Sequence, residues 1–123
     1  MTASKKILIV EDERLVAQTT ALLLSERGYD VKSVRSATEG LSTFEVWQPD
    51  LAIVDVFLPD QNGVEMAIAL RSEYPGLKIL LFSGVPDTQA LLEQARRRGY
   101  EFEILAKPVH PTVVFEHVES LLT

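Results

Sequence analysis

The chain has 123 residues, the usual length of one domain, which leaves no room for a second. It contains no cysteine and two histidines, which excludes disulfides, thiolate chemistry and metal sites rich in either residue. The net charge of −6 argues against nucleic acid as a direct partner, because binding phosphates requires a broad cationic face.

Short apolar runs predict the strands. The runs at residues 7–10, 51–54 and 79–82 lack polar alternation, which is typical of parallel strands covered on both faces. The runs at 29–34 and 102–106 are more mixed, so we expect those strands nearer the edges of the sheet.

Amphipathic stretches between the runs predict five helices. The first ends at Gly28 and carries one stripe, formed by Leu15, Val16, Thr19, Leu22 and Leu23. Capping residues, glycines and prolines bound the others at about residues 36–48, 63–74, 86–99 and 111–122.

The alternation of strand and helix predicts an α/β fold, a doubly wound parallel sheet with helices on both faces. Ligands of such sheets bind beyond the carboxyl ends of the strands, where the strand order reverses. Candidate functional residues are therefore those that follow the strands.

The residues at these strand ends suit one another chemically. In chain order they are Glu11 with Asp12, Asp55, Ser83, and Lys107 with Pro108. Clustered carboxylates repel one another and tend to recruit a cation, and their oxygens favour Mg²⁺. A carboxylate can also attack phosphorus to form an aspartyl phosphate, whose oxygens a metal, an ammonium and a hydroxyl would stabilise. Each residue alone could be an ordinary cap, turn or solvated residue. Because all of them are expected at the carboxyl edge of the same sheet, a common site is favoured.

Five segments, taken in order, carry a family resemblance. They are Ile7-Leu8-Ile9-Val10-Glu11-Asp12-Glu13, Asp50-Leu51-Ala52-Ile53-Val54-Asp55, Leu58-Pro59-Asp60-Gln61-Asn62-Gly63, Leu80-Leu81-Phe82-Ser83-Gly84 and Leu105-Ala106-Lys107-Pro108. With them the chain resembles the receiver domain of two-component response regulators over nearly its whole length. Residues 1–123 are expected to be one such domain, with a flavodoxin-like sheet of strand order 2-1-3-4-5 and five helices.

The resemblance also implies a metal site. Asp55 would be the phosphoacceptor and a ligand of Mg²⁺, or of Mn²⁺ as an alternative. Asp12 would bind the metal directly, Glu11 through water, and Phe57 through its backbone carbonyl.

Two further residues would hold the phosphoryl group. The resemblance implies that Ser83 binds one phosphoryl oxygen and moves on activation. Lys107 would pair with another oxygen, and its bond to Pro108 is expected to be cis.

The resemblance further implies a signalling switch that catalyses its own phosphorylation and dephosphorylation and is not a turnover enzyme. The phosphodonor would be a histidine kinase or a histidine phosphotransfer protein. The domain would be a monomer or a weak homodimer through its fourth and fifth helices and fifth strand. No apolar run approaches the roughly 20 residues that span a bilayer, so we expect a soluble, cytoplasmic protein. The sequence leaves open a stand-alone receiver or part of a longer regulator, the kinase, and the downstream target or output domain.

Two positions depart from the pattern of the family. Receivers usually carry Tyr or Phe three residues before the lysine, where this chain has Ile104. Either a small bulge or a longer loop lets Phe102 take that role, or Ile104 packs against the fourth helix and there is no aromatic switch. Phe57 either shields an aspartyl phosphate from water or is an exposed hydrophobe without kinetic effect.

Three other functions fit the sequence less well. A phosphate-independent interaction domain would normally have lost the acidic pair, the acceptor or the lysine; this chain retains them all, and only Ile104 keeps that alternative open. A phosphatase of the haloacid dehalogenase type needs an Asp where this chain has Phe57. A flavodoxin-like cofactor binder needs a Gly- or Ser/Thr-rich loop after the first strand, where this chain has acids.

Overall fold

The apolar runs form a five-stranded parallel sheet of order β2-β1-β3-β4-β5, which confirms the predicted topology. The computed structural model describes residues 4–84 and 88–123. The strands are β1 (Lys6–Val10), β2 (Asp30–Val34), β3 (Leu51–Asp55), β4 (Lys78–Ser83) and β5 (Glu103–Ala106). The two mixed runs, β2 and β5, are the edge strands, as predicted.

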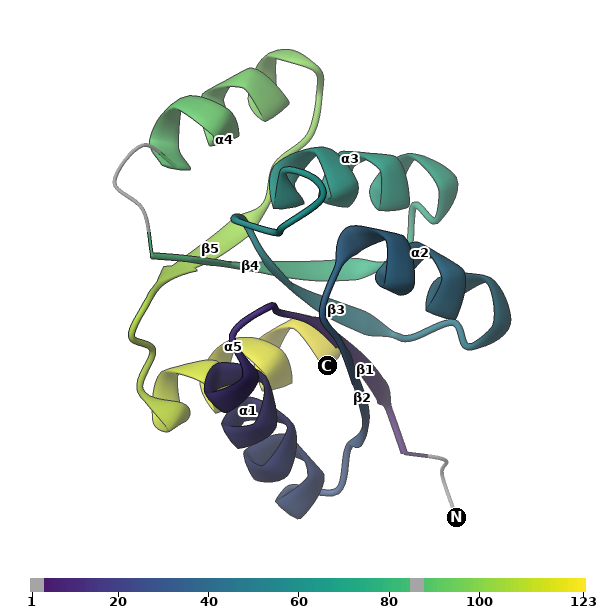
Figure 1. The fold of residues 1–123 in the computed structure, drawn as a ribbon, viewed down its shortest axis with the longest axis vertical. Coiled ribbons are helices and arrows are strands. Elements are labelled where there is room, and N and C mark those ends of the chain that lie inside the picture. Colours follow the sequence, from purple (N-terminus) through teal and green to yellow (C-terminus); the bar gives the residue numbers. More distant parts are fainter. Residues whose placement is uncertain (1–3, 85–87) are drawn as a thin grey trace.

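Within the described ranges, one helix follows each strand (Figure 1). The helices are α1 (Arg14–Glu26), α2 (Ala37–Val46), α3 (Gly63–Glu73), α4 (Thr88–Arg97) and α5 (Pro111–Leu122). The Ser36 hydroxyl caps α2 by accepting from Glu39 N at 3.1 Å, as the capping box predicts. The predicted start of the fourth helix, at residue 86, lies outside the described residues.

The sheet separates two apolar cores. Alternate residues of β1 point to opposite faces: Leu8 and Val10 join one core, Ile7 and Ile9 the other. Helices α2, α3 and α4 cover the first face, and α1 and α5 cover the second (Figure 1). Because both faces are covered, the functional residues must project from an end of the sheet.

The predicted stripe of α1 is only partly buried. Leu15 and Leu22 are 77% and 60% exposed, whereas Ala17 and Leu24 are buried. A shift of two residues turns an α-helix by about 200°, so Leu15 lies nearly opposite Ala17. The helix is apolar on more than one side, and the side with the small Ala17 packs on the sheet. The predicted stripe is therefore partly free to line a surface.

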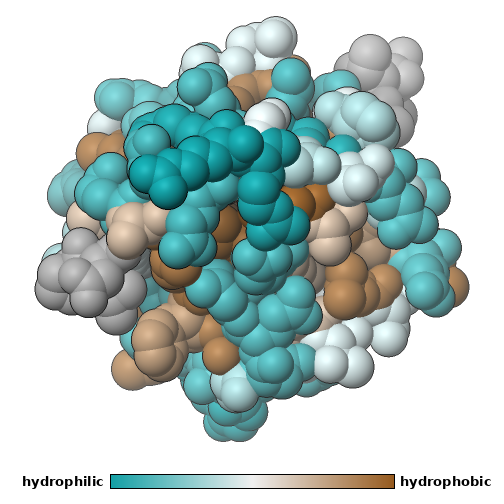
Figure 2. Space-filling view, turned by 90° about the horizontal axis from the view of Figure 1, so that it is seen from above, coloured by the Kyte–Doolittle hydropathy of each residue, from teal (hydrophilic) through white to brown (hydrophobic). Residues whose placement is uncertain are grey.

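One face of the molecule is largely hydrophilic. Seen from above the α4 side, hydrophilic residues cover most of the surface and apolar residues form small patches between them (Figure 2). Among the helices of the described ranges, none has the length and apolar character needed to cross a bilayer. An apolar hollow lies between α1 and α5.

Candidate functional site

The predicted site residues meet at the carboxyl edge of the sheet. Asp55 and Ser83 are the last residues of β3 and β4. Glu11 directly follows β1, and Lys107 directly follows β5. Glu11, Asp55 and Ser83 are buried, with at most 5% of their surface exposed. Buried polar side chains at a covered sheet edge indicate a built site, because each must be compensated by a partner.

Two contacts hold the Asp55 carboxylate. Its Oδ1 accepts a hydrogen bond from the backbone N–H of Phe57 at 3.0 Å, and its Oδ2 accepts one from Lys107 Nζ at 3.0 Å. The carboxylate is therefore oriented by the loop that follows it and by a cation from a distant strand.

Glu11 competes with Asp55 for the same ammonium. Its Oε2 accepts from the N–H of Glu13 at 3.1 Å, and its Oε1 lies 2.7 Å from Lys107 Nζ. The latter is an ion pair without hydrogen-bond alignment, since Oε1 is buried and has no hydrogen-bond partner. Burial, and next its contact with Asp55, raise the pKa of Glu11 to about 7, although Lys107 opposes the rise. The site therefore holds more negative charge than one ammonium neutralises.

Lys107 is the cation at the centre of this cluster. Burial alone would lower its pKa, but the close contacts with the Glu11 and Asp55 carboxylates outweigh burial and raise the pKa above its ordinary value. Its N–H also donates to Ser83 O at 2.8 Å, and its bond to Pro108 is cis, as expected. The ammonium is therefore charged and fixed beside the Asp55 carboxylate.

Asp12 and Asp55 line one small hollow. It measures about 290 Å³ and is also lined by Glu13, Phe57, Gly84 and Lys107. The Asp12 side chain is 49% exposed, and its Oδ1 lies 3.9 Å from Arg35, a weak surface pair. Asp12 is thus available to a ligand in this hollow.

The residues present fit Mg²⁺. Within 4–84 and 88–123, no three acidic or histidine side chains already surround a metal position. Mg²⁺ needs no such cage, since it keeps several waters and binds through one or two carboxylates. The unbonded, buried Oε1 of Glu11 and the crowded carboxylates are what a divalent cation would relieve.

The loop after Asp55 is shaped by residues whose roles the sequence did not predict. A Cβ on Gly63 would lie 2.0 Å from the carbonyl oxygen of Asp55, so only glycine allows this approach. Asp60 accepts hydrogen bonds from Ala37 N and Thr38 N, each at 2.9 Å, and from the Thr38 hydroxyl at 2.6 Å. The hydroxyl of Thr38 and then the two N–H groups lower the pKa of Asp60 to about 2. From the sequence, Asn62-Gly63 predicted only the start of a helix. The close approach of Gly63 to Asp55 and the cap that Asp60 places on α2 join segments far apart in the chain, so no local sequence pattern predicts them.

The aromatic-switch alternatives are resolved in favour of Ile104. Strand β5 pairs in continuous register with β4, Ile104 opposite Leu81, so no bulge brings Phe102 forward. Ile104 is partly buried against the core beneath α2, α3 and α4. Phe102 instead stacks on Tyr100, with ring centroids 6.4 Å apart, and lies 5.2 Å from the Arg71 guanidinium.

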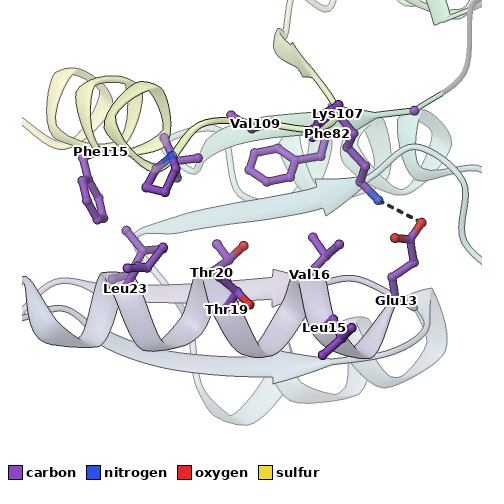
Figure 3. Close-up of a pocket in the computed structure, with 15 residues that line it drawn as sticks. Glu13, Leu15, Val16, Thr19, Thr20, Leu23, Phe82, Lys107, Val109 and Phe115 are labelled. Atoms are coloured by element: carbon purple, nitrogen blue, oxygen red, sulfur yellow. Dashed lines mark ion pairs between the residues drawn. The ribbon is translucent and has the colours of Figure 1, made fainter.

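An apolar cleft adjoins the site. It lies between α1 and α5, has a volume of about 470 Å³, and runs from Glu13 and Lys107 to Phe115 (Figure 3). Figure 3 also shows the ion pair across its mouth, where Lys107 Nζ lies 3.6 Å from Glu13 Oε1. The exposed Leu15 lines the cleft near this mouth.

Comparison with known proteins gives a consistent result. Residues 7–119 match the family model described as the response regulator receiver domain. The chain is 30% identical over 122 residues to the alkaline phosphatase synthesis transcriptional regulatory protein PhoP of Bacillus subtilis, covering 97% of this chain and 49% of that protein. It is 29% identical to the DNA-binding response regulator MtrA of Mycobacterium tuberculosis, covering 98% of this chain and 52% of that protein. The chain thus spans about half the length of these curated relatives.

Solved structures share the fold. A response regulator receiver domain protein from Methanospirillum hungatei superposes with a TM-score of 0.87 at 29% identity, covering 97% of this chain and 94% of the other. A signal receiver domain of an HD domain-containing protein from Pseudomonas fluorescens gives a TM-score of 0.89 at 26% identity, covering 99% and 89%.

Proposed function

Because the chain belongs to the response regulator receiver domain family, we propose that it takes a phosphoryl group on Asp55 from a phosphohistidine in a Mg²⁺-dependent reaction. The coarser role, a phosphoacceptor signalling domain of two-component systems, follows from membership. The finer proposal is carried by one observation: the buried Asp55 carboxylate is held between Lys107 Nζ and Phe57 N at the carboxyl edge of the sheet.

The reaction follows from these contacts. A carboxylate oxygen of Asp55 attacks the phosphorus, an O–P bond forms, and the P–N bond breaks with its electron pair passing to the donor imidazole. Lys107 neutralises charge on one phosphoryl oxygen, and the Ser83 hydroxyl donates to another. Burial of Asp55 and Ser83 limits water at the reacting atoms.

Mg²⁺ would be held by Asp12 and Asp55, by Glu11 through water, and by the Phe57 carbonyl. When bound, it neutralises charge on the transferring phosphoryl group. The protein residues fit this role because their negative charge exceeds what Lys107 balances.

The phosphodonor would dock at the cleft between α1 and α5. A phosphohistidine must reach Asp55 from outside, and this cleft opens beside Lys107 with Leu15 exposed at its rim (Figure 3). An apolar hollow rimmed by polar groups is typical of a protein contact. The occupant proposed here is the histidine-bearing domain of a kinase or phosphotransfer protein.

Intact mass after incubation with Mg²⁺ and acetyl phosphate tests the proposal. We expect a gain of one phosphoryl group, lost when Mg²⁺ is chelated and lost in Asp55→Asn. Absence of the gain, together with no binding of beryllofluoride, would point to a phosphate-independent interaction domain.

A further inference from the structure

Ser83 has a hydroxyl neighbour on the adjoining helix. Its Oγ is hydrogen-bonded to Oγ1 of Thr88, the first residue of α4. Ser83 and Thr88 are 5% and 4% exposed, so water does not replace this contact when it breaks. The pair therefore connects the phosphoryl-binding edge of the sheet directly to the first turn of α4.

The backbone of Ser83 is held, whereas its side chain can rotate. Ser83 pairs with Ala106 in the ladder between β4 and β5, and its carbonyl accepts from Lys107 N at 2.8 Å. Rotation about Cα–Cβ between staggered positions is the movement left to the hydroxyl. Either hydroxyl could be the donor in this pair, but a rotation that carries Ser83 Oγ to a phosphoryl oxygen takes it away from Thr88 in both cases.

We propose that Thr88 is a positioning residue: it holds the Ser83 hydroxyl in the unphosphorylated state and loses it to the phosphoryl oxygen when Asp55 is phosphorylated. This inference rests on the proposed function and adds the route by which phosphorylation reaches α4. A hydrogen bond to an ionised oxygen is about twice as strong as one between neutral hydroxyls. The exchange is therefore favourable only while the phosphoryl group is present.

The route needs no aromatic residue at position 104. The side chain of Ile104 has no hydrogen-bonding group, and the residue lies in regular register on β5. The Ser83–Thr88 contact reaches α4 from β4 instead. A receiver with isoleucine at this position thus retains a physical link between its acceptor site and the surface of α4.

Two matched variants test the role of Thr88. Thr88→Val keeps the shape of the side chain and removes the hydroxyl, whereas Thr88→Ser keeps the hydroxyl. Calorimetric titration with beryllofluoride and Mg²⁺ should show about three- to tenfold tighter binding to Thr88→Val, because the contact between Ser83 and the Thr88 hydroxyl no longer has to be broken. Thr88→Ser should bind like the wild type. Thr88→Ala removes the same hydroxyl and should also bind beryllofluoride more tightly than the wild type does. It replaces Thr88→Val in the test if the valine variant does not fold.

Amide hydrogen exchange distinguishes the proposed role from a merely structural one, which would not change the exchange rates of the first turn of α4 to those of the ligand-bound protein. Without ligand, the first turn of α4 in Thr88→Val should exchange as it does in the beryllofluoride-bound wild type. Equal or weaker binding by Thr88→Val, with wild-type exchange in α4, would overturn the inference alone. Failure of the wild type to bind beryllofluoride would overturn the proposed function and this inference with it.

Discussion

Lys107, at the end of β5, reaches past β4 and places its Nζ 3.0 Å from Oδ2 of Asp55, at the end of β3. The two residues are 52 positions apart in the chain. Both are mostly buried, with side-chain exposures of 14% and 5%. A fixed, charged ammonium is thus already present where charge would develop on a transferred phosphoryl group.

Replacement of Lys107 should impair phosphorylation more than folding. In Lys107→Met, phosphorylation by acetyl phosphate should slow by about 10²- to 10³-fold, because one stabiliser of the phosphoryl oxygens is lost. Intact mass against time measures the rate. Lys78→Met, at the exposed opposite end of β4, is the matched control and should keep the wild-type rate. Equal rates in both variants would contradict the role of Lys107.

Gly63 should tolerate no side chain. A Cβ there would lie 2.0 Å from Asp55 O, so Gly63→Ala must displace the loop at a cost of about 1–3 kcal/mol of unfolding free energy, or more. Urea denaturation measures this loss, and phosphorylation of Asp55 should fall with it. Gly76→Ala is the control, since no atom lies within 4 Å of its added Cβ. Similar stability of the two variants would show that the loop can relax.

Asp60 should stabilise the fold in a pH-dependent manner. Its pKa is lowered from 3.8 to about 2 in the folded chain, so the unfolded chain binds the proton more readily. The stabilisation is therefore present above the ordinary pKa and is lost as the pH falls through about 2. At neutral pH, Asp60→Ala should melt at a lower temperature than wild type, and the difference should shrink on acidification. Asp30→Ala, at an exposed position, is the control; a difference independent of pH would contradict the explanation.

Phe57 should control the lifetime of the phosphorylated state if its exposed ring shields the aspartyl phosphate. The side chain is 71% exposed and lines the hollow that contains Asp55. Phe57→Asn replaces this apolar cover with a polar group, so loss of the phosphoryl group should become faster. Decay of phosphorylated protein after removal of donor measures the rate. Identical decay in both proteins would favour the reading of Phe57 as an exposed hydrophobe.

The cleft between α1 and α5 should matter for a protein donor and not for a small one. Leu15→Asp places a charge at its rim and should slow transfer from a phosphorylated histidine phosphotransfer domain that phosphorylates the wild type. Phosphorylation by acetyl phosphate should be unchanged. Val46→Asp, at an 87% exposed apolar position on α2, is the matched control. If Leu15→Asp slowed phosphorylation equally with the protein donor and with acetyl phosphate, the substitution would be acting on the acceptor site and not on docking of the donor.

Much of the fold was predictable because the sheet leaves a strong pattern. Strands buried on both faces, such as β3, are continuous apolar runs, and the mixed runs became edge strands. The orientation of α1 was not predictable in this way. Leu15 and Leu22 fit an apolar stripe as well as Ala17 and Leu24 do, and contacts with the sheet decide between them.

Ligands of doubly wound sheets bind beyond the carboxyl ends of the strands, and from this we predicted which site residues come together, including Asp55, Ser83 and Lys107. A position at a strand end does not predict their partners. The contact between Ser83 and Thr88, the cap from Asp60 to α2 and the tight approach of Gly63 join elements that only the folded chain brings together. Asp12 lines the same hollow as Asp55 but faces solvent and Arg35, which spacing alone does not reveal.

Locating the phosphoryl group tests most directly whether Asp55 is the phosphoacceptor. Borohydride reduces an aspartyl phosphate to homoserine, so peptide mass mapping after reduction identifies the modified residue. We expect homoserine at position 55 and at no other acidic position, and we expect the modification to be absent in Asp55→Asn. Homoserine at Asp12, or an unmodified Asp55 in a protein that has gained a phosphoryl group, would contradict this role of Asp55.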